Sequence, residues 1–563
     1  MIYHCEDRTC NYWDEGEKLP ERCPQCGRKL LRANEADMTG DDWTALGNTL
    51  WDAEASDKKR MVDCFRKAAY LGSAWGVCNL GICMEQGNGV EADPVQAFWL
   101  YQQAVEMGSL NAVCCLGVCY QYGIGTAPDA KQAAELYCKA AEYGSPRGQM
   151  LLARAFHDGI GVEADAAEAV YWVRAAAYQR YGEGMHRLGV CYEYGDGVEQ
   201  NWEHAVHWFR EAAESGVGVA MTDLGYCYEK GCGVEQSWEQ AFSWYRRGAE
   251  CGYPVSMSNL GLCYKRGYGV EQNWQEAVKW YEQGAQCGHL QSMNNLAYCY
   301  ERGEGVEQNE DRALYWYRRG AEAGSDYCMY CLGWNYSNGE GVEQNMTEAI
   351  RWYTAAAEGG NADAMHNLGW HYDYGEGVEQ DMKKAICWYE RAAEQNHPAA
   401  MNSLGECYAM GRGVPRDLET AMEWYRRAAE LGEAMADYNM GWHLEQAGKL
   451  SEAYAHYRKA ADGNDDSAWW ALGRFYENGV VVAQDGKEAR RCYETGEKLG
   501  SVKCKMRLAR CKLLGIGGHR AKKAGLDLCR QALELAKESS EKEDYGYEAE
   551  MNLLRRTIAE NES

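Results

Sequence analysis

The sequence predicts an all-α protein: a right-handed α-α superhelix, or solenoid, of about 14 helix-turn-helix repeats of 36 residues. Two observations lead to this prediction. A Leu-Gly or Leu-Ala pair returns at a step of 36 residues through most of the chain, and a fixed period in the 30s is typical of solenoids. Within each copy the apolar residues recur three or four positions apart, which is the spacing of one helix face.

The leucine of that pair, called here the marker leucine, counts the copies. It stands at Leu80, Leu116, Leu152, Leu188, Leu224, Leu260, Leu296, Leu332, Leu368 and Leu404. Met440 keeps the step, Leu472 follows after 32 residues and Leu508 after another 36. Leu46, 34 residues before Leu80, marks a degenerate first copy, so the chain holds 14 candidate units.

The unit around Leu260 illustrates the first helix of each copy. Met257, Leu260 and Tyr264 form its apolar stripe. Gly261 removes a side chain at a point where a second helix would press close. Gly267 ends the helix, because glycine readily adopts the left-handed conformation that other residues resist. We therefore expect a tight Gly-x-Gly-Val loop after each regular first helix.

The second helix begins at a residue that can cap it. Such a side chain accepts a hydrogen bond from a free amide of the first turn. In the same unit Ala277, Trp280, Tyr281 and Ala285 form the packing face, and Gly288 ends the helix. The capping positions along the chain hold Asp93, Asp129, Asp165, Asn201, Ser237, Asn273, Asn309, Asn345, Asp381 and Asp417.

Three tryptophans occupy the first turn of the second helix in successive units. They are Trp202, Trp238 and Trp274. Since they adjoin the cap, we expect them to cover the loop and part of the neighbouring unit. The alternative is a tryptophan ladder that binds an extended ligand.

The conserved spacing of three blocks within the unit resembles that of a known family. The blocks are Leu-Gly-x-x-Tyr, Gly-x-Gly-Val and Ala-x-x-Trp-Tyr, for example at 260–264, 267–270 and 277–281. They resemble the Sel-1-like repeat, a relative of the tetratricopeptide repeat, over roughly residues 40–520. The resemblance implies an α-solenoid that serves as an adaptor in multi-protein assemblies.

The N-terminal segment carries a pattern that favours a metal. Cys5 and Cys10 precede a Cys-Pro-Gln-Cys-Gly turn at Cys23 and Cys26. Four thiolates in tetrahedral array suit one structural Zn per chain and leave no open position for catalysis. The segment resembles a short zinc ribbon. His4 replacing Cys5 as a ligand, iron bound as in rubredoxin, and four unrelated thiols are the alternatives.

These patterns divide the chain into three parts. Residues 1–35 form the zinc-ribbon-like metal knuckle, and residues 36–520 form the repeat solenoid. Residues 521–563 form C-terminal capping helices and a polar tail. Leu526, Cys529, Leu533 and Ala536 give the last part a helical apolar stripe.

The charge and composition limit the partners and the compartment. A formal net charge of −27 opposes binding to nucleic-acid phosphates and anionic lipids. The first residues show no secretory signal, and no window approaches the ~18 apolar residues of a membrane span. We therefore expect a cytoplasmic protein of bacterial type, a monomer, with neither a nucleic acid nor a membrane as its partner.

The cysteines also indicate a reducing compartment. Of the 26 cysteines, Cys83, Cys119, Cys191, Cys227, Cys263, Cys299 and Cys407 recur three positions after the marker leucine. A whole repeat separates such equivalents, which favours buried thiols over disulfides. Secreted cysteine-rich members of the family carry a C-x7-C pair, and Asn259 and Asn295 stand where Cys251 and Cys287 would need partners.

A partner groove is expected along the first helices, beside their core stripe. One residue before the marker leucine stand Asn79, Asp223, Asn259, Asn295 and Asn367, and two residues after it stand Tyr226, Tyr298, Trp334, Trp370 and Trp442. Amides can bond to a peptide backbone, and aromatic rings supply contact area. The alternative is that the polar residues join neighbouring helices and the aromatic residues only pack.

No motif in the sequence indicates an enzyme. The Gly-x-Gly triplets lack the full dinucleotide or P-loop pattern, and neither H-E-x-x-H nor G-x-S-x-G occurs. The leading hypothesis is a non-enzymatic scaffold that binds a protein or peptide in the solenoid groove. One alternative is binding or hydrolysis of β-lactams, which the resemblance to cysteine-rich relatives suggests. The other is a nucleic-acid adaptor that acts through the zinc ribbon.

Overall fold

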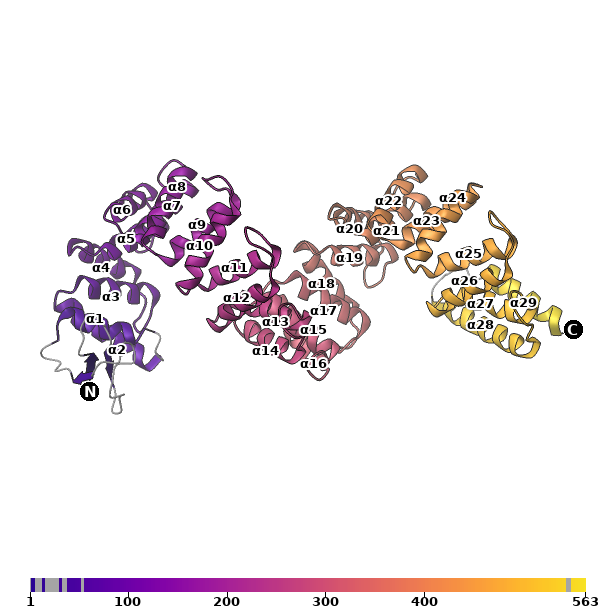
Figure 1. Ribbon diagram of the computed structural model, residues 1–563, viewed down its shortest axis with the longest axis horizontal. Helices are drawn as coiled ribbons and strands as arrows, with labels where there is room; N and C mark the ends of the chain where they lie inside the picture. Colours follow the sequence, from indigo (N-terminus) through magenta and orange to yellow (C-terminus); the bar gives the residue numbers. More distant parts are fainter. Residues whose placement is uncertain are drawn as a thin grey trace. The chain divides into compact units, whose positions relative to one another are not determined.

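The computed structural model describes residues 2–5, 13–15, 30–32, 38–51, 55–542 and 548–562. These residues form three short strands and 29 helices. β1 (Ile2–Cys5) lies between β2 (Trp13–Glu15) and β3 (Leu30–Arg32) in an antiparallel sheet. Helices α1 to α28 then alternate as first and second members of 14 pairs (Figure 1). The predicted helical repeat and its 14 copies are confirmed.

The first helices have odd numbers and hold the marker leucines. They are α1 (Gly40–Thr49), α3 (Ala74–Gln86), α5 (Leu110–Tyr122), α7 (Pro146–Asp158), α9 (Gly182–Tyr194), α11 (Gly218–Lys230), α13 (Pro254–Arg266), α15 (Leu290–Arg302), α17 (Asp326–Asn338), α19 (Ala362–Tyr374), α21 (Pro398–Met410), α23 (Ala434–Gln446), α25 (Asp466–Asn478) and α27 (Val502–Leu514). All except α1, which has 10 residues, have 13 residues and therefore make between three and four turns.

The second helices have even numbers, and α4 to α22 begin directly after the predicted caps. They are α2 (Ala55–Tyr70), α4 (Pro94–Glu106), α6 (Ala130–Glu142), α8 (Ala166–Tyr178), α10 (Trp202–Glu214), α12 (Trp238–Glu250), α14 (Trp274–Gln286), α16 (Glu310–Glu322), α18 (Met346–Glu358), α20 (Met382–Glu394), α22 (Leu418–Glu430), α24 (Leu450–Asp462), α26 (Gly486–Lys498) and α28 (Lys522–Lys542). Asn273, for example, accepts a hydrogen bond from the amide of Glu276 at 3.1 Å.

The residue after the marker leucine sets how closely the two helices of a pair approach. A Cβ atom added to Gly261 would lie 2.5 Å from the ring of Tyr281, and one added to Gly81 would lie 2.7 Å from the ring of Tyr101. The expected role of Gly261 is therefore confirmed. The Tyr101 hydroxyl donates to Glu85 on the first helix at 2.6 Å, so the buried ring also has its polar end satisfied.

In the regular repeats the Gly-x-Gly loop joins each repeat to the one before it. Gly269 has a φ of +67°, and an added Cβ would lie 2.2 Å from the carbonyl oxygen of Trp238. The ring of Trp238 stacks on that of Tyr268 in this loop, with centroids 4.1 Å apart. This is the packing role that the sequence favoured for the tryptophans over a ligand-binding ladder.

The C-terminal residues extend the repeat pattern by half a unit. α28 packs against α27 as the second helix of the fourteenth pair, and α29 (Glu548–Glu562) contacts both. In α29, Met551 and Leu554 are buried at the same spacing as Met257 and Leu260. Arg555 follows Leu554 in place of the usual glycine. A large side chain there is acceptable because no second helix follows it in the chain.

The chain divides into two compact units. The first consists of residues up to Ser292 together with Glu304–Val306, and the second of Met293–Gly303 together with residues from Glu307 onward. The division falls within the repeat that contains α15. Among the described helices, none is long and apolar enough to cross a membrane.

Candidate functional site

Several successive first helices contact one another directly within a unit. α1 contacts α3, α3 contacts α5 and α5 contacts α7 in the first unit, and α25 contacts α27 in the second. We call the surface of the first helices the first-helix face. It includes the positions one residue before and two residues after each marker leucine, which are the positions predicted to form the groove.

The polar residues before the marker leucine join neighbouring first helices. Asn79 is buried and donates to Asn48 on α1 at 2.8 Å. Asp223 on α11 bonds to His186 Nε2 on α9 at 2.7 Å. Asn259, Asn295 and Asn367 at equivalent positions are half-buried. For Asn79 and Asp223 the structure therefore shows the inter-helix role that was the alternative to partner recognition.

The aromatic residues after the marker leucine are much more open. Tyr226 is 43% exposed, Trp334 44%, Trp370 39% and Trp442 43%. Tyr298 is half-buried. These rings lie on α11, α17, α19, α23 and α15 respectively. A contiguous set of exposed rings of this kind can mark an interaction surface.

Basic side chains accompany two of these rings one helical turn later. Lys230 Nζ lies 5.8 Å from the ring centroid of Tyr226. The guanidinium carbon of Arg302 lies 6.0 Å from the centroid of Tyr298. The face therefore combines aromatic area with local positive charge, although the whole chain is strongly acidic.

A partly buried charged cluster interrupts the aromatic row in the second unit. Glu406 occupies the position two residues after its marker leucine, and burial raises the pKa of its carboxyl. Burial likewise raises the pKa of Asp373, while the nearby Arg412 opposes this shift. Arg412 Nη1 lies 2.7 Å from Asp373, which is 2% exposed. Asn439 donates to Glu406 at 3.2 Å. These groups hold α19, α21 and α23 together.

The predicted metal ligands lie almost entirely outside the described residues. The backbone of Cys5 ends β1, whereas Cys10, Cys23 and Cys26 are outside the described ranges. Within those ranges no group of three or more His, Cys, Asp or Glu residues is arranged to hold a metal. The zinc site therefore stays a prediction.

The remaining 22 cysteines are free thiols. The repeated cysteines three positions after the marker leucine are buried, as expected, and Cys227 is an example at 1% exposure. Burial raises the pKa of Cys83 to about 11 and that of Cys227 to about 12. Thiols in this state are inert packing groups rather than nucleophiles.

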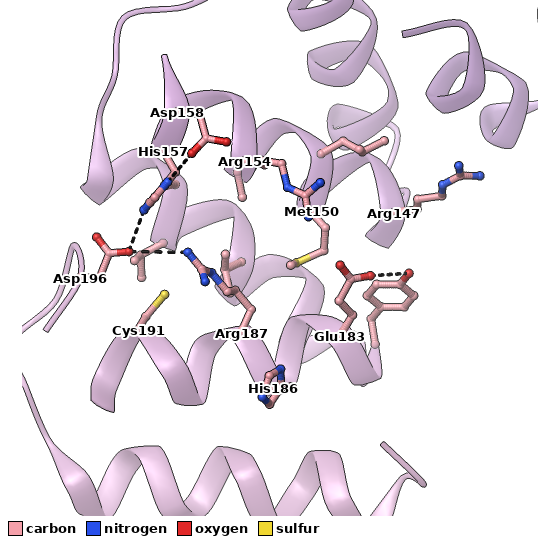
Figure 2. Close-up of a pocket in the computed structure, with 16 residues that line it drawn as sticks. Arg147, Met150, Arg154, His157, Asp158, Glu183, His186, Arg187, Cys191 and Asp196 are labelled. Carbon is pink, nitrogen blue, oxygen red and sulfur yellow. Dashed lines mark hydrogen bonds and ion pairs between the residues drawn. The ribbon is translucent and has the colours of Figure 1, made fainter. Parts of the chain in front are cut away.

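A pocket in the first unit was not expected from the sequence. It is lined by residues of α7, α8 and α9, among them the side chains labelled in Figure 2. Its volume is about 440 Å³. Its lining includes Arg154 and Arg187, which occupy the two groove positions of their repeats. These two arginines can be found in the sequence by comparing the groove positions between repeats. The predicted groove includes only amide, acidic and aromatic residues at those positions.

Comparisons with known proteins agree with the repeat architecture. The model of the Sel1 repeat matches residues 76–109, 112–145, 146–181, 182–217, 218–253, 254–289, 290–325, 326–361, 362–397, 398–433, 434–465 and 468–501. These are 12 matches, against 14 helix pairs in the structure. The first and last pairs, which form the ends of the array, lie outside the matched residues.

Two solved structures of similar sequence are informative. One is a protective antigen present in uropathogenic Escherichia coli strains that displays an SLR fold: identity is 29%, coverage is 76% of this chain and 94% of that chain, and the TM-score is 0.56. The other is a Sel1 repeat protein from Oxalobacter formigenes: identity is 28%, coverage is 58% and 92%, and the TM-score is 0.44. No curated protein matches the sequence.

Proposed function

The chain belongs to the Sel1 repeat family, and from this we propose that it is a non-enzymatic scaffold whose first-helix face binds a protein or peptide. Solenoids of this kind generally serve as protein-interaction scaffolds. The observation that supports the proposal here is the row of exposed aromatic rings. Within the second unit an exposed tryptophan occurs at this position three times, at Trp334, Trp370 and Trp442.

Physical chemistry favours these rings as anchors for a partner. Tryptophan and tyrosine bring a large contact area with few rotatable bonds, and they dominate the binding energy of many interfaces. The backbone groups of the helices are already paired, so a bound segment would contact mainly side chains. The exposed Trp370 and the adjacent Tyr374, with ring centroids 5.0 Å apart, offer one such contact.

The same proposal includes the chain's other expected properties. We propose that it acts as a cytoplasmic monomer and that its N-terminal segment holds one structural zinc through Cys5, Cys10, Cys23 and Cys26. A net charge of −27 supports a partner that is neither a nucleic acid nor an anionic membrane. The four thiols suit zinc chemically and would stabilise a short segment that has little core of its own.

The decisive experiment compares purified baits in affinity capture from native lysate. Wild-type protein is compared with a Trp334→Ala plus Trp370→Ala variant and with Tyr315→Ala. Tyr315 is 52% exposed on α16, a second helix, so it controls for the loss of an exposed ring elsewhere in the same unit. We expect the tryptophan variant to lose specific partners that the control retains. Equal capture by all three proteins would remove the first-helix face as the binding surface.

A further inference from the structure

The pocket on α7, α8 and α9 arises from a coordinated departure in one repeat. In regular repeats a glycine abuts a tyrosine ring, and a polar side chain accepts that tyrosine's hydroxyl hydrogen bond. In the neighbouring repeat these residues are Gly117, Tyr137 and Gln121, with the hydroxyl 2.7 Å from Gln121 Oε1. The equivalent positions one repeat later hold Ala153, Val173 and His157.

This departure creates space where other repeats hold a buried ring. Val173 is smaller than the tyrosine that other repeats have at this position. Valine also has no hydroxyl group, so the hydrogen-bond acceptor of the other repeats is not required, and His157 stands in its place. The result is a pocket of about 440 Å³ whose lining includes Ala153, Ala169, Val170 and Val173. Pockets of this size with an apolar base and a few polar groups are typical of small-ligand sites.

The charged groups that line the pocket are not equally satisfied. His157 contacts both Asp158 and Asp196, at 2.6 and 3.2 Å, and Asp196 also lies 3.8 Å from Arg187 (Figure 2). The third acid, Glu183, accepts a hydrogen bond from the Tyr181 hydroxyl at 3.3 Å. All three carboxylates of the lining therefore have partners within the protein.

Two arginines of the lining, in contrast, have no carboxylate partner among the described residues. Arg154 makes no hydrogen bond or ion pair there. Arg147 contacts only the thiol of Cys115, at 3.6 Å. A guanidinium is always charged and offers several donors in a plane that matches a carboxylate. The lining therefore offers, beside its apolar base, the solvent-exposed guanidinium of Arg154, which has no carboxylate partner among the described residues.

From this arrangement we propose that the pocket binds a ligand that combines an apolar body with one carboxylate. The apolar body lies against Ala153, Val170 and Val173, and the carboxylate pairs with Arg154. Such a group could belong to a free carboxylic acid or to an acidic side chain beside an apolar one in a peptide. The site is in the first unit, and it does not depend on the tryptophan row of the second unit.

The experiment titrates the full-length protein with 3-phenylpropionate by isothermal calorimetry or ligand-observed NMR. 3-Phenylpropionamide and 3-phenylpropylamine have the same apolar body without the negative charge. We expect the acid to bind at least about tenfold more tightly than either analogue, as befits a hydrogen-bonded charge pair. Equal binding of acid and amide would overturn the proposal, as would no binding of the acid at millimolar concentration.

A capped peptide distinguishes the two possible sources of the carboxylate. Acetyl-Gly-Phe-Glu-Gly-amide has no terminal charges and offers only its glutamate carboxylate. Tighter binding of this peptide than of the free acid would identify a peptide segment as the ligand. Binding of the free acid alone would identify a small molecule.

Two protein variants locate the binding. We expect Arg154→Gln to weaken binding of 3-phenylpropionate by about tenfold or more. Arg246→Gln should leave it unchanged, because Arg246 is an exposed arginine on α12 that pairs with Glu250 in the same helix. A combined Ala153→Gly, Val173→Tyr and His157→Gln variant restores the regular pattern and should abolish binding without loss of the folded state. Undiminished binding by Arg154→Gln, or by the folded triple variant, would refute the site.

Discussion

At the residue scale, the fit between a small residue and a ring recurs along the array. The glycine after the marker leucine faces an aromatic side chain in most repeats, as Gly189 faces Phe209. Where the second-helix residue is smaller, the first-helix residue is alanine: Ala153 stands opposite Val173, and Ala509 clusters with Cys529. Ala297, in register with Tyr317, is the exception. A larger first-helix residue thus accompanies a smaller second-helix residue, but the added methyl group does not replace the volume of a ring.

The first prediction tests this fit with Gly369→Ala. The added Cβ would lie 2.6 Å from the ring of Tyr389 and 3.2 Å from the carbonyl oxygen of Ala385. Alanine gains up to about 1 kcal/mol in helix propensity, but overpacking costs about 1–3 kcal/mol. We expect a net destabilisation of about 1–2 kcal/mol, measured by urea unfolding. In a double-mutant cycle, Tyr389→Val should relieve most of this cost, and simple additivity would contradict the prediction.

The second prediction concerns Asp465, the N-cap of α25. Burial raises its pKa from 3.8 to about 6, although the amide of Ala468 donates to it at 2.6 Å. Since the folded-state pKa lies above the unfolded value, the folded chain binds this proton more tightly. The resulting stabilisation is complete below about pH 4 and is lost as pH rises through about 6.

Asp465→Asn should remove this pH dependence and keep the cap, because asparagine caps helices as well as aspartate does. We expect the variant to gain about 2 kcal/mol relative to wild type between pH 4 and pH 7. Urea unfolding at both pH values measures the difference. An unchanged difference between the two proteins at pH 4 and pH 7 would show that burial does not shift this carboxyl.

At the element scale, the Gly-x-Gly loop determines how one repeat joins the next. The second glycine of the loop approaches the first turn of the preceding second helix at several junctions. Gly125 approaches Pro94, Gly161 approaches Ala130 and Gly233 approaches Trp202, each at a backbone carbonyl. Two constraints coincide at this glycine, a positive φ and direct backbone contact, and both favour glycine. In the repeat of α25, Val481 takes the equivalent position with a φ of +66°.

The third prediction separates these two constraints. Gly252 has a φ of +83° with nothing within 4 Å of an added Cβ, whereas the Cβ of Gly269→Ala would lie 2.2 Å from a carbonyl oxygen. Gly252→Ala should cost about 1–2 kcal/mol, the price of the left-handed conformation. Gly269→Ala should cost at least about 3 kcal/mol, because backbone contact adds to the same strain. Thermal unfolding compares them, and equal losses would show that the junction tolerates a side chain.

At the scale of the whole molecule, each repeat depends on its neighbours for its core. The marker leucines and second-helix rings are buried along both compact units, with Leu224 and Leu404 at 0% exposure. The ends of such an array need different sequences, because one side of a terminal repeat has no neighbour. At the C-terminal end, Arg507 on α27 lies 2.7 Å from two oxygens of Glu550, which attaches α29 to the last pair.

The fourth prediction concerns the N-terminal metal. Elemental analysis of purified protein should find one zinc per chain, and Cys23→Ser plus Cys26→Ser should lose it, because a thiolate site cannot close without two of its four ligands. Cys251→Ser plus Cys287→Ser is the matched control, since both of these cysteines are exposed thiols in the repeats. A wild-type chain without zinc, or a Cys23 and Cys26 variant that retains it, would rule out the ribbon.

The sequence predicted the fold far better than the site. Helix pairs, caps and loops follow from periodic residues such as Leu260 and Gly269, because each one acts within its own unit or on an adjacent unit. The groove positions were identified in the same way, yet Asn79 and Asp223 bond to neighbouring helices rather than standing open. Whether a polar side chain pairs internally depends on the facing helix, which periodicity does not describe.

The repeat, its period and the residues that fill its core follow from the amino-acid sequence, because those properties recur along the chain. The place where the array leaves space becomes visible only in the folded protein. The pocket depends on Ala153, Val173 and His157 on two helices, and on Arg187 from the next repeat. Packing brings these residues together across about 35 positions of sequence. A cavity is a property of side chains that meet, so its presence follows from contacts rather than from the pattern along the chain.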